Sequence, residues 1–82
     1  MQQPAIVLYT QNGCVESIKT RAWLEQHGIA FRERNVSDDP DAAQDLLATG
    51  IFATPLLVIG NQFVLGFRTH AIEATLRKNG LI

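Results

Sequence analysis

The chain has 82 residues, of which 46% are hydrophobic, and this predicts one small domain, residues 1–82, with a modest core. Seven basic and eight acidic side chains give a net charge of -1, which argues against a nucleic-acid surface and against a polybasic membrane attachment. The apolar runs are too short to cross a bilayer, and Met1–Pro4 lacks the features of a signal peptide, so we expect a soluble cytoplasmic protein.

An apolar strand and a helix open the chain, and its only cysteine lies between them. Residues 5–9 are a continuous apolar run, which predicts a strand buried on both faces. Residues 15–27 predict a helix that ends at Gly28, because glycine commonly terminates helices. Cys14 is therefore expected at a helix N-terminus, where free N–H groups and the helix dipole favour a reactive thiolate. The apolar positions of this helix form a broad stripe: Ile18, Ala22, Trp23 and Leu24.

The middle of the chain predicts a second strand and a second helix. Residues 31–36 indicate a polar strand, and we expect its charged side chains to be solvated: Arg32, Glu33 and Arg34. Asp39 is suited to cap the following helix, and Pro40 suits its first position, since the N–H that proline lacks would have no partner there. We expect this helix to run to Gly50.

The last third predicts a hairpin and a final helix. Residues 56–59 and 63–65 indicate antiparallel strands joined by a turn at Gly60-Asn61. Thr69 is suited to cap a helix that ends near Asn79-Gly80. The order of these elements predicts an α/β fold, in which a four-stranded mixed sheet has helices on both faces.

Three segments resemble those of a known family: Cys14-Val15-Glu16-Ser17, Ala53-Thr54-Pro55 and Gly66-Phe67-Arg68. With the order of elements, they make nearly the whole chain similar to the glutaredoxin family, which has the thioredoxin fold in a minimal form with three helices (βαβαββα). The resemblance implies that Pro55 is a cis proline facing the cysteine. It also implies that the backbone of Thr54 pairs with a bound peptide or with glutathione.

The chain departs from each of the patterns known in this family. Gln11 stands where typical glutaredoxins carry a lysine, and the last helix lacks their Gly-Gly pair. Gly66-Phe67-Arg68 is more similar to the NrdH-redoxins, the glutaredoxin-like electron donors of ribonucleotide reductase, but these have two active-site cysteines. Ser17 stands where the second cysteine would be, and the sequence leaves open whether this serine is natural or replaces a resolving cysteine.

The resemblance implies a thiol-disulfide oxidoreductase with Cys14 as its nucleophile. Cys14 would form a mixed disulfide, and an external thiol would release it, because a single cysteine cannot form an internal disulfide. Ser17 can donate a hydrogen bond to the thiolate, whereas Glu16 is expected to repel it. Glutathione is the expected co-substrate. The other expected partners are disulfide-bonded or glutathionylated proteins, thioredoxin reductase and ribonucleotide reductase, with no nucleic acid and no membrane.

The residues expected to bind the substrate or glutathione surround the cysteine: Gln11, Gly13, Val15, Thr54, Pro55, Gly66, Phe67 and Arg68. Phe67 is either a core residue or a partner contact, and Arg68 is either a partner for a glutathione carboxylate or a solvated charge. Two other functions stay open: a carrier of a [2Fe-2S] cluster shared by two subunits with glutathione, and a binding module without catalysis. We expect a monomer with no permanently bound cofactor and no metal site made by the protein alone, since His27 and His70 are isolated.

Overall fold

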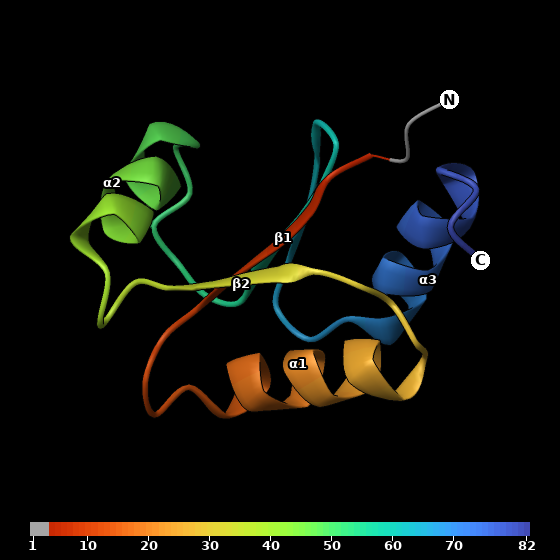
Figure 1. Ribbon diagram of the computed structural model, residues 1–82, viewed down its shortest axis with the longest axis horizontal. Coiled ribbons are helices and arrows are strands. Elements are labelled where there is room, and N and C mark those ends of the chain that lie inside the picture. Colours follow the sequence, from red (N-terminus) through yellow and green to blue (C-terminus); the bar gives the residue numbers. More distant parts are fainter. Residues whose placement is uncertain (1–3) are drawn as a thin grey trace.

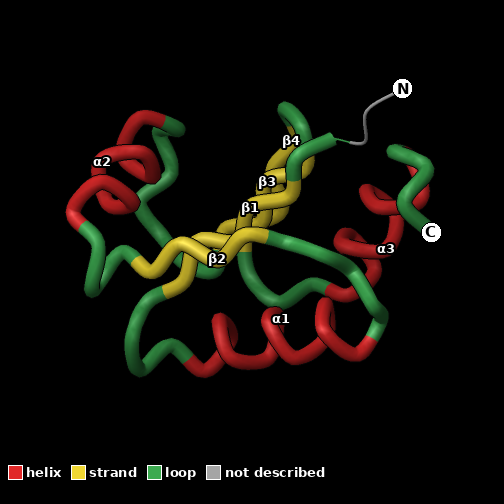
Figure 2. The backbone as a smooth tube through the Cα atoms, viewed as in Figure 1, coloured by secondary structure: helices red, strands yellow, loops and turns green. Residues whose placement is uncertain are grey.

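The computed structural model describes residues 4–82. The lack of a signal peptide was inferred from Met1–Pro4, and the first three of these residues lie outside the described residues. The described part has the predicted order of elements: β1 (Ile6–Thr10), α1 (Val15–Gln26), β2 (Arg32–Asn35), α2 (Pro40–Ala48), β3 (Leu56–Ile59), β4 (Gln62–Leu65) and α3 (Thr69–Lys78). The strands form one sheet in the order β2, β1, β3, β4 (Figure 2). β1 runs parallel to β2 and antiparallel to β3, and β3 and β4 form an antiparallel hairpin. The predicted minimal glutaredoxin form of the thioredoxin fold is therefore confirmed.

Helices cover both faces of the sheet, with α1 and α3 on one face and α2 on the other (Figure 1). The main core lies between the sheet and the first pair of helices: Leu8, Leu24, Leu57, Ile59, Val64, Ile72 and Leu76. A smaller core lies under α2: Tyr9, Leu46 and Leu56. Because successive strand residues point to opposite faces, β1 contributes Leu8 to one core and Tyr9 to the other.

The buried face of α1 differs from the predicted apolar stripe. Its buried residues lie three and four positions apart, as one helix face requires, and two of them are polar: Ser17, Thr20 and Leu24. Ile18 is 54% exposed and Ala22 is exposed, while Trp23 is half-buried and stacks on His27 with ring centroids 3.8 Å apart. The first half of α1 therefore turns hydroxyl groups toward the sheet and apolar side chains toward solvent.

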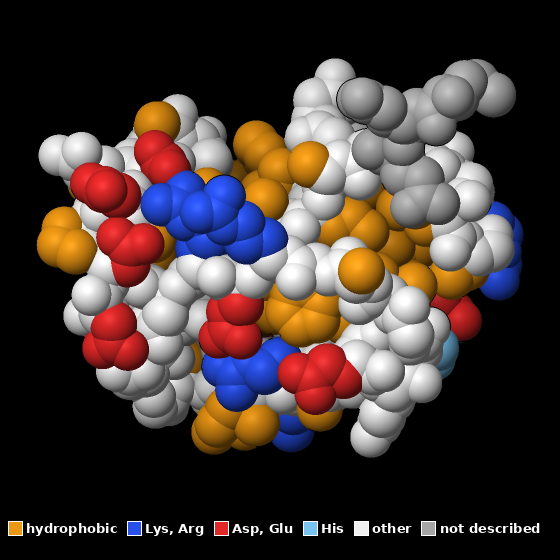
Figure 3. All heavy atoms as spheres, viewed as in Figure 1, with side chains coloured by type: hydrophobic (Ala, Val, Ile, Leu, Met, Phe, Trp, Pro, Cys, Tyr) orange, Lys and Arg blue, Asp and Glu red, His pale blue; other side chains and the backbone are white. Residues whose placement is uncertain are grey.

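Two of the charged residues of β2 form ion pairs: Glu33 is exposed, as predicted, whereas Arg34 is half-buried. Glu33 accepts hydrogen bonds from Arg21 at 2.6 and 2.7 Å and from the Thr10 hydroxyl at 2.8 Å. Arg34 forms an ion pair with Asp45 of α2. These contacts fasten β2 to helices on both faces of the sheet, and basic side chains accordingly lie beside acidic ones over β2 and α2 (Figure 3).

The local signals at helix ends were correct for both ends of α2 and for the end of α3 near Asn79-Gly80, but not for the start of α3. The side chain of Asp39 caps α2, and Pro40 is its first residue. In α3, Thr69 is the first helical residue, and Arg68 holds the N-cap position without a side-chain hydrogen bond. The helix begins early because the Arg68 N–H closes a turn on the carbonyl of Gly66 at 3.1 Å, which leads the chain directly into α3.

Candidate active site

Cys14 lies where the chain leaves β1 and enters α1. It is half-buried and holds the N-cap position of α1, with φ -87° and ψ 108°. Its N–H donates to the carbonyl of Gln11 at 3.2 Å, across a turn in which Gly13 has φ +76°. Glycine takes this conformation without steric cost, so Gly13 permits the turn. The turn leaves the sulfur at the positive end of α1, where a thiolate is favoured.

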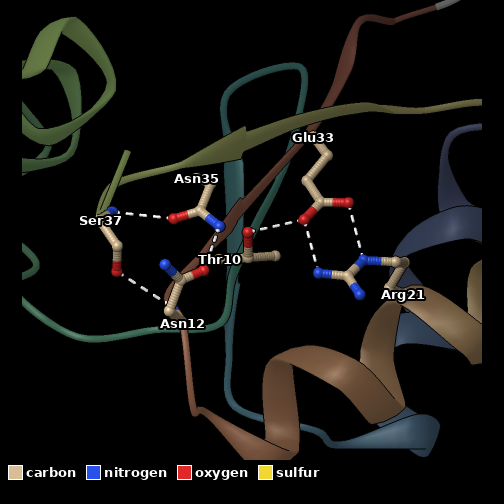
Figure 4. A network of polar contacts seen from close by, with 6 residues as sticks. All are labelled: Thr10, Asn12, Arg21, Glu33, Asn35 and Ser37. Carbon is tan, nitrogen blue, oxygen red and sulfur yellow. Dashed lines mark hydrogen bonds and ion pairs between the residues drawn. The ribbon is translucent and has the colours of Figure 1, made fainter. Parts of the chain in front are cut away.

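A polar network holds the loop in front of Cys14 (Figure 4). The Asn12 N–H donates to the Ser37 hydroxyl at 3.0 Å, and the Asn12 side chain accepts from Asn35 at 2.8 Å and donates to Asp38 at 3.2 Å. This loop is therefore fastened to the segment that follows β2. Sequence reasoning missed Asn12, because its signal was only a short polar side chain in a turn.

The start of β3 lies against Cys14, and the Thr54–Pro55 peptide bond is cis, as predicted. The Thr54 carbonyl oxygen is 3.8 Å from the Cys14 sulfur. The Thr54 hydroxyl donates to the Gln11 side chain at 3.3 Å, and Pro55 is buried. Four of the predicted site residues thus meet, although about 40 positions separate the two parts of the chain.

The segment between β4 and α3 also reaches this end of the sheet. The Gly66 N–H donates to the Pro55 carbonyl at 2.8 Å, and the Phe67 N–H donates to the Glu16 carboxylate at 3.2 Å. The Phe67 side chain packs against the main core and is half-buried, so it is a core residue with a partly exposed surface. The bond to Glu16 was not foreseen, because nothing in the sequence links the first turn of α1 to a loop 51 residues later.

Two predicted site residues make no comparable contact. Val15 is 62% exposed at the start of α1. Arg68 is exposed, and its side chain makes no hydrogen bond or ion pair within residues 4–82. Val15 adjoins Cys14 in the chain and Arg68 adjoins Phe67, so both side chains border the site and face solvent.

The surroundings of Cys14 lower the pKa of its thiol. The largest cause is the hydrogen bond of the Ser17 side chain. Burial acts against it, and the Ser17 N–H, the Thr54 side chain and the Glu16 N–H lower the pKa further. The Ser17 hydroxyl is buried one turn from Cys14 and has no hydrogen-bond partner in the described chain, so it is free to donate to the thiolate. Repulsion by the Glu16 carboxylate is not among these influences on the Cys14 pKa, and the carboxylate accepts a hydrogen bond from the Phe67 N–H.

The chemistry that the site offers is that of one sulfur, a hydroxyl that stabilises its anion and a backbone carbonyl beside it. This set suits thiol-disulfide exchange, in which a thiolate attacks a disulfide sulfur. Across residues 4–82, no group of three or more His, Cys, Asp or Glu side chains is placed to hold a metal ion. Within the same range, no helix is both long enough and apolar enough to span a membrane.

Comparison with known proteins assigns the site to a family. The family model described as Glutaredoxin matches residues 6–64, which include Cys14, Thr54 and Pro55. The chain belongs to the glutaredoxin family. It is a glutaredoxin-like disulfide oxidoreductase, as the resemblance implied, in a family that needs no permanent cofactor.

The relatives of this glutaredoxin include NrdH proteins. The glutaredoxin-like protein NrdH of Salmonella typhimurium is 37% identical over 69 residues, which are 84% of this chain and 85% of that protein. The NrdH-redoxin of Escherichia coli, which has a thioredoxin-like activity profile, has a similar structure, with a TM-score of 0.76 and 34% identity over 85% of this chain and 92% of that one. The thioredoxin-like protein BC3987 has a TM-score of 0.79 and 28% identity over 84% of this chain and 96% of that one.

Proposed function

We propose that this glutaredoxin reduces disulfides by a monothiol mechanism with Cys14 as the nucleophile. The observation that carries the proposal is the setting of the only cysteine in the sequence. It lies half-buried at the start of α1, 3.8 Å from the Thr54 carbonyl, and its pKa is lowered by the Ser17 hydroxyl. A thiolate at neutral pH is the species that thiol-disulfide exchange requires.

The proposed reaction has two exchange steps. The Cys14 thiolate first attacks one sulfur of the substrate disulfide, so that a Cys14–substrate disulfide forms and the second substrate sulfur leaves as a thiolate. An external thiolate then attacks the substrate sulfur of the mixed disulfide and forms a disulfide with it, and the Cys14 sulfur leaves as the regenerated thiolate. With a glutathionylated protein as substrate and glutathione as the external thiol, the protein thiol is released in the first step and oxidised glutathione in the second. The external thiol supplies the electrons, because Ser17 cannot take the part of a resolving cysteine.

The proposed docking surface is the end of the sheet around Cys14. Thr54 offers its backbone to an extended segment of the substrate, which can align beside it as an added strand. Gln11 holds Thr54 in place through the hydrogen bond of 3.3 Å. Three more side chains border this surface. Val15 and Phe67 can contact apolar groups of a partner protein, and Arg68 can attract an anionic group of a protein or of glutathione. The free thiol suits a reducing compartment, which supports a cytoplasmic location.

Turnover of a glutathione mixed disulfide tests the proposed function. Glutathione and thioredoxin reductase are compared as electron donors, because similarity to the NrdH proteins supports the reductase and the fold supports either donor. We expect turnover with at least one donor, and we expect Cys14→Ser to abolish it. Turnover that persists in Cys14→Ser would show that another group carries the reaction.

Ser17→Cys tests the monothiol step. After treatment with oxidised glutathione, mass spectrometry should show a stable adduct of one glutathione on the chain with Ser17. Ser17→Cys should lose the glutathione and form an internal disulfide, since Ser17 lies one turn from Cys14 on the same helix. Thr20→Cys is the control, because the helical rise places it about 9 Å from Cys14, too far for a disulfide. A covalent dimer as the main product of the chain with Ser17 would contradict the proposal.

A further inference from the structure

Glu16 carries a negative charge at the start of the helix that begins at the reactive cysteine. It lies in the first turn of α1, two residues after Cys14. Its carboxylate oxygen accepts from the Phe67 N–H at 3.2 Å and lies 3.6 Å from the point where a Cβ on Gly66 would be. Gly66 is bonded in turn to the carbonyl of Pro55 at 2.8 Å. The charge is thus fixed between the helix that carries the sulfur and the segment that faces the cis proline.

The Glu16 carboxylate occupies a backbone donor at the edge of the site. The Phe67 N–H lies one residue before Arg68, the N-cap residue of α3, near the positive end of that helix, where a negative charge is favoured. Because Glu16 already accepts from this N–H, a carboxylate of the substrate cannot take the bond without displacing it.

No ion pair neutralises Glu16 within residues 4–82. Lys19 lies one turn further along α1, and Arg68 follows Phe67, and both are exposed. Their positive charges offset part of the field of Glu16, so its effect is best measured as a difference between variants. A charge in contact with the docking surface acts on charged substrates more than on neutral ones.

We infer that Glu16 is a specificity-determining residue, which makes Cys14 discriminate against anionic disulfides and in favour of neutral or cationic ones. Oxidised glutathione belongs to the disfavoured class, and a disulfide on a protein surface without nearby acidic groups belongs to the favoured one. The inference rests on the proposed function of Cys14 as the nucleophile. It assigns the substrate class of that reaction by charge.

Three small disulfides of similar size and different charge test this inference: cystamine, 2-hydroxyethyl disulfide and dithiodiglycolate. The second-order rate constant of the reduced protein is measured with each of them. The ratio between two disulfides is independent of how much Cys14 is ionised, since the same sulfur attacks both. In Glu16→Gln the ratio of the anionic to the cationic disulfide should rise about fivefold at low salt, and the rise should shrink at high salt.

Two further variants make the test specific. Glu25→Gln removes the same charge near the far end of α1 and should leave the ratio unchanged. Glu16→Asp keeps the charge in the first turn and should keep the natural ratio. Oxidised glutathione should follow dithiodiglycolate in each variant.

Three outcomes would overturn the inference: an unchanged ratio in Glu16→Gln, an equal change for all three disulfides, or the same ratio in Glu16→Asp and Glu16→Gln. An equal change would mean that Glu16 acts on the sulfur or on folding rather than on the substrate. A natural chain that reacts with none of the disulfides would instead contradict the proposed role of Cys14.

Discussion

At the scale of single residues, opposing influences decide the charge of the Cys14 sulfur. Burial raises the pKa of the thiol, but the Ser17 hydroxyl has the larger effect, and the pKa is lowered as a result. The sequence predicted that Ser17 would lie near the sulfur and be able to donate to its thiolate, because residues three apart share a helix face. It could not predict that the Glu16 carboxylate accepts a hydrogen bond from the Phe67 N–H, because that partner lies 51 residues away in the chain.

We expect the alkylation of Cys14 to show the lowered pKa directly. The rate should rise with pH and level off above the pKa, with a midpoint below the value of about 8.5 for a free cysteine. More thiolate is then present at neutral pH than in an unfolded chain. Ser17→Ala should raise the midpoint, because it removes the strongest stabilisation of the thiolate. Thr20→Ala, which removes a buried hydroxyl one turn further along α1, is the matched control. A midpoint for Cys14 at or above the pKa of a free cysteine would contradict the prediction, because the effect of burial would then exceed that of the hydrogen bonds.

At the scale of helices and strands, the sequence was informative where the chemistry is local. Gly28 ends α1 with φ +67°, and Asp39 and Pro40 begin α2, because each signal acts within a few residues. The buried face of α1 could not be predicted, since Ser17 and Thr20 are buried there in place of an apolar stripe, although their hydroxyls have no hydrogen-bond partner in the described chain. Which face of α1 is buried therefore depends on how the helix packs against the sheet, and not on the spacing of its apolar residues.

The cap of α2 makes a prediction at this scale. Asp39→Ala removes the side chain that accepts from the Asp41 N–H at 2.9 Å, and it should lower the free energy of unfolding by about 1 kcal/mol. Asp39→Asn keeps a capping oxygen but loses the charge that lies 3.7 Å from Arg34, and it should cost much less. Urea unfolding measures both. Equal losses in the two variants would assign the effect to the ion pair instead of the cap.

At the scale of the whole molecule, sheet topology assembles the site from three distant segments. Tyr9 near the end of β1 pairs with Leu56 at the start of β3, and Leu56 pairs with Leu65 at the end of β4. The loops that adjoin these residues carry Cys14, Thr54-Pro55 and Gly66, so they must meet at one end of the sheet. The order of elements was enough to predict this meeting. The hydrogen bonds of Asn12 and Glu16 were not predictable, since they depend on how the loops pack once they have met.

The last prediction concerns which partner uses each side of this surface. Phe67→Ala should weaken the reaction coupled to a protein reductase about tenfold, because a partly exposed aromatic ring can anchor a protein interface. Arg68→Ala should slow the reaction with glutathione, because it removes an exposed cation that attracts the anionic thiol. Phe67→Leu is the control, because leucine keeps an apolar side chain against the core but removes the aromatic ring. Urea unfolding of each variant shows whether a slower reaction reflects lost stability or lost docking of the reductase. Both reactions are measured for each variant beside Cys14→Ser. Unchanged rates in Phe67→Ala and Arg68→Ala, while Cys14→Ser is inactive, would move the docking surface away from the start of α3.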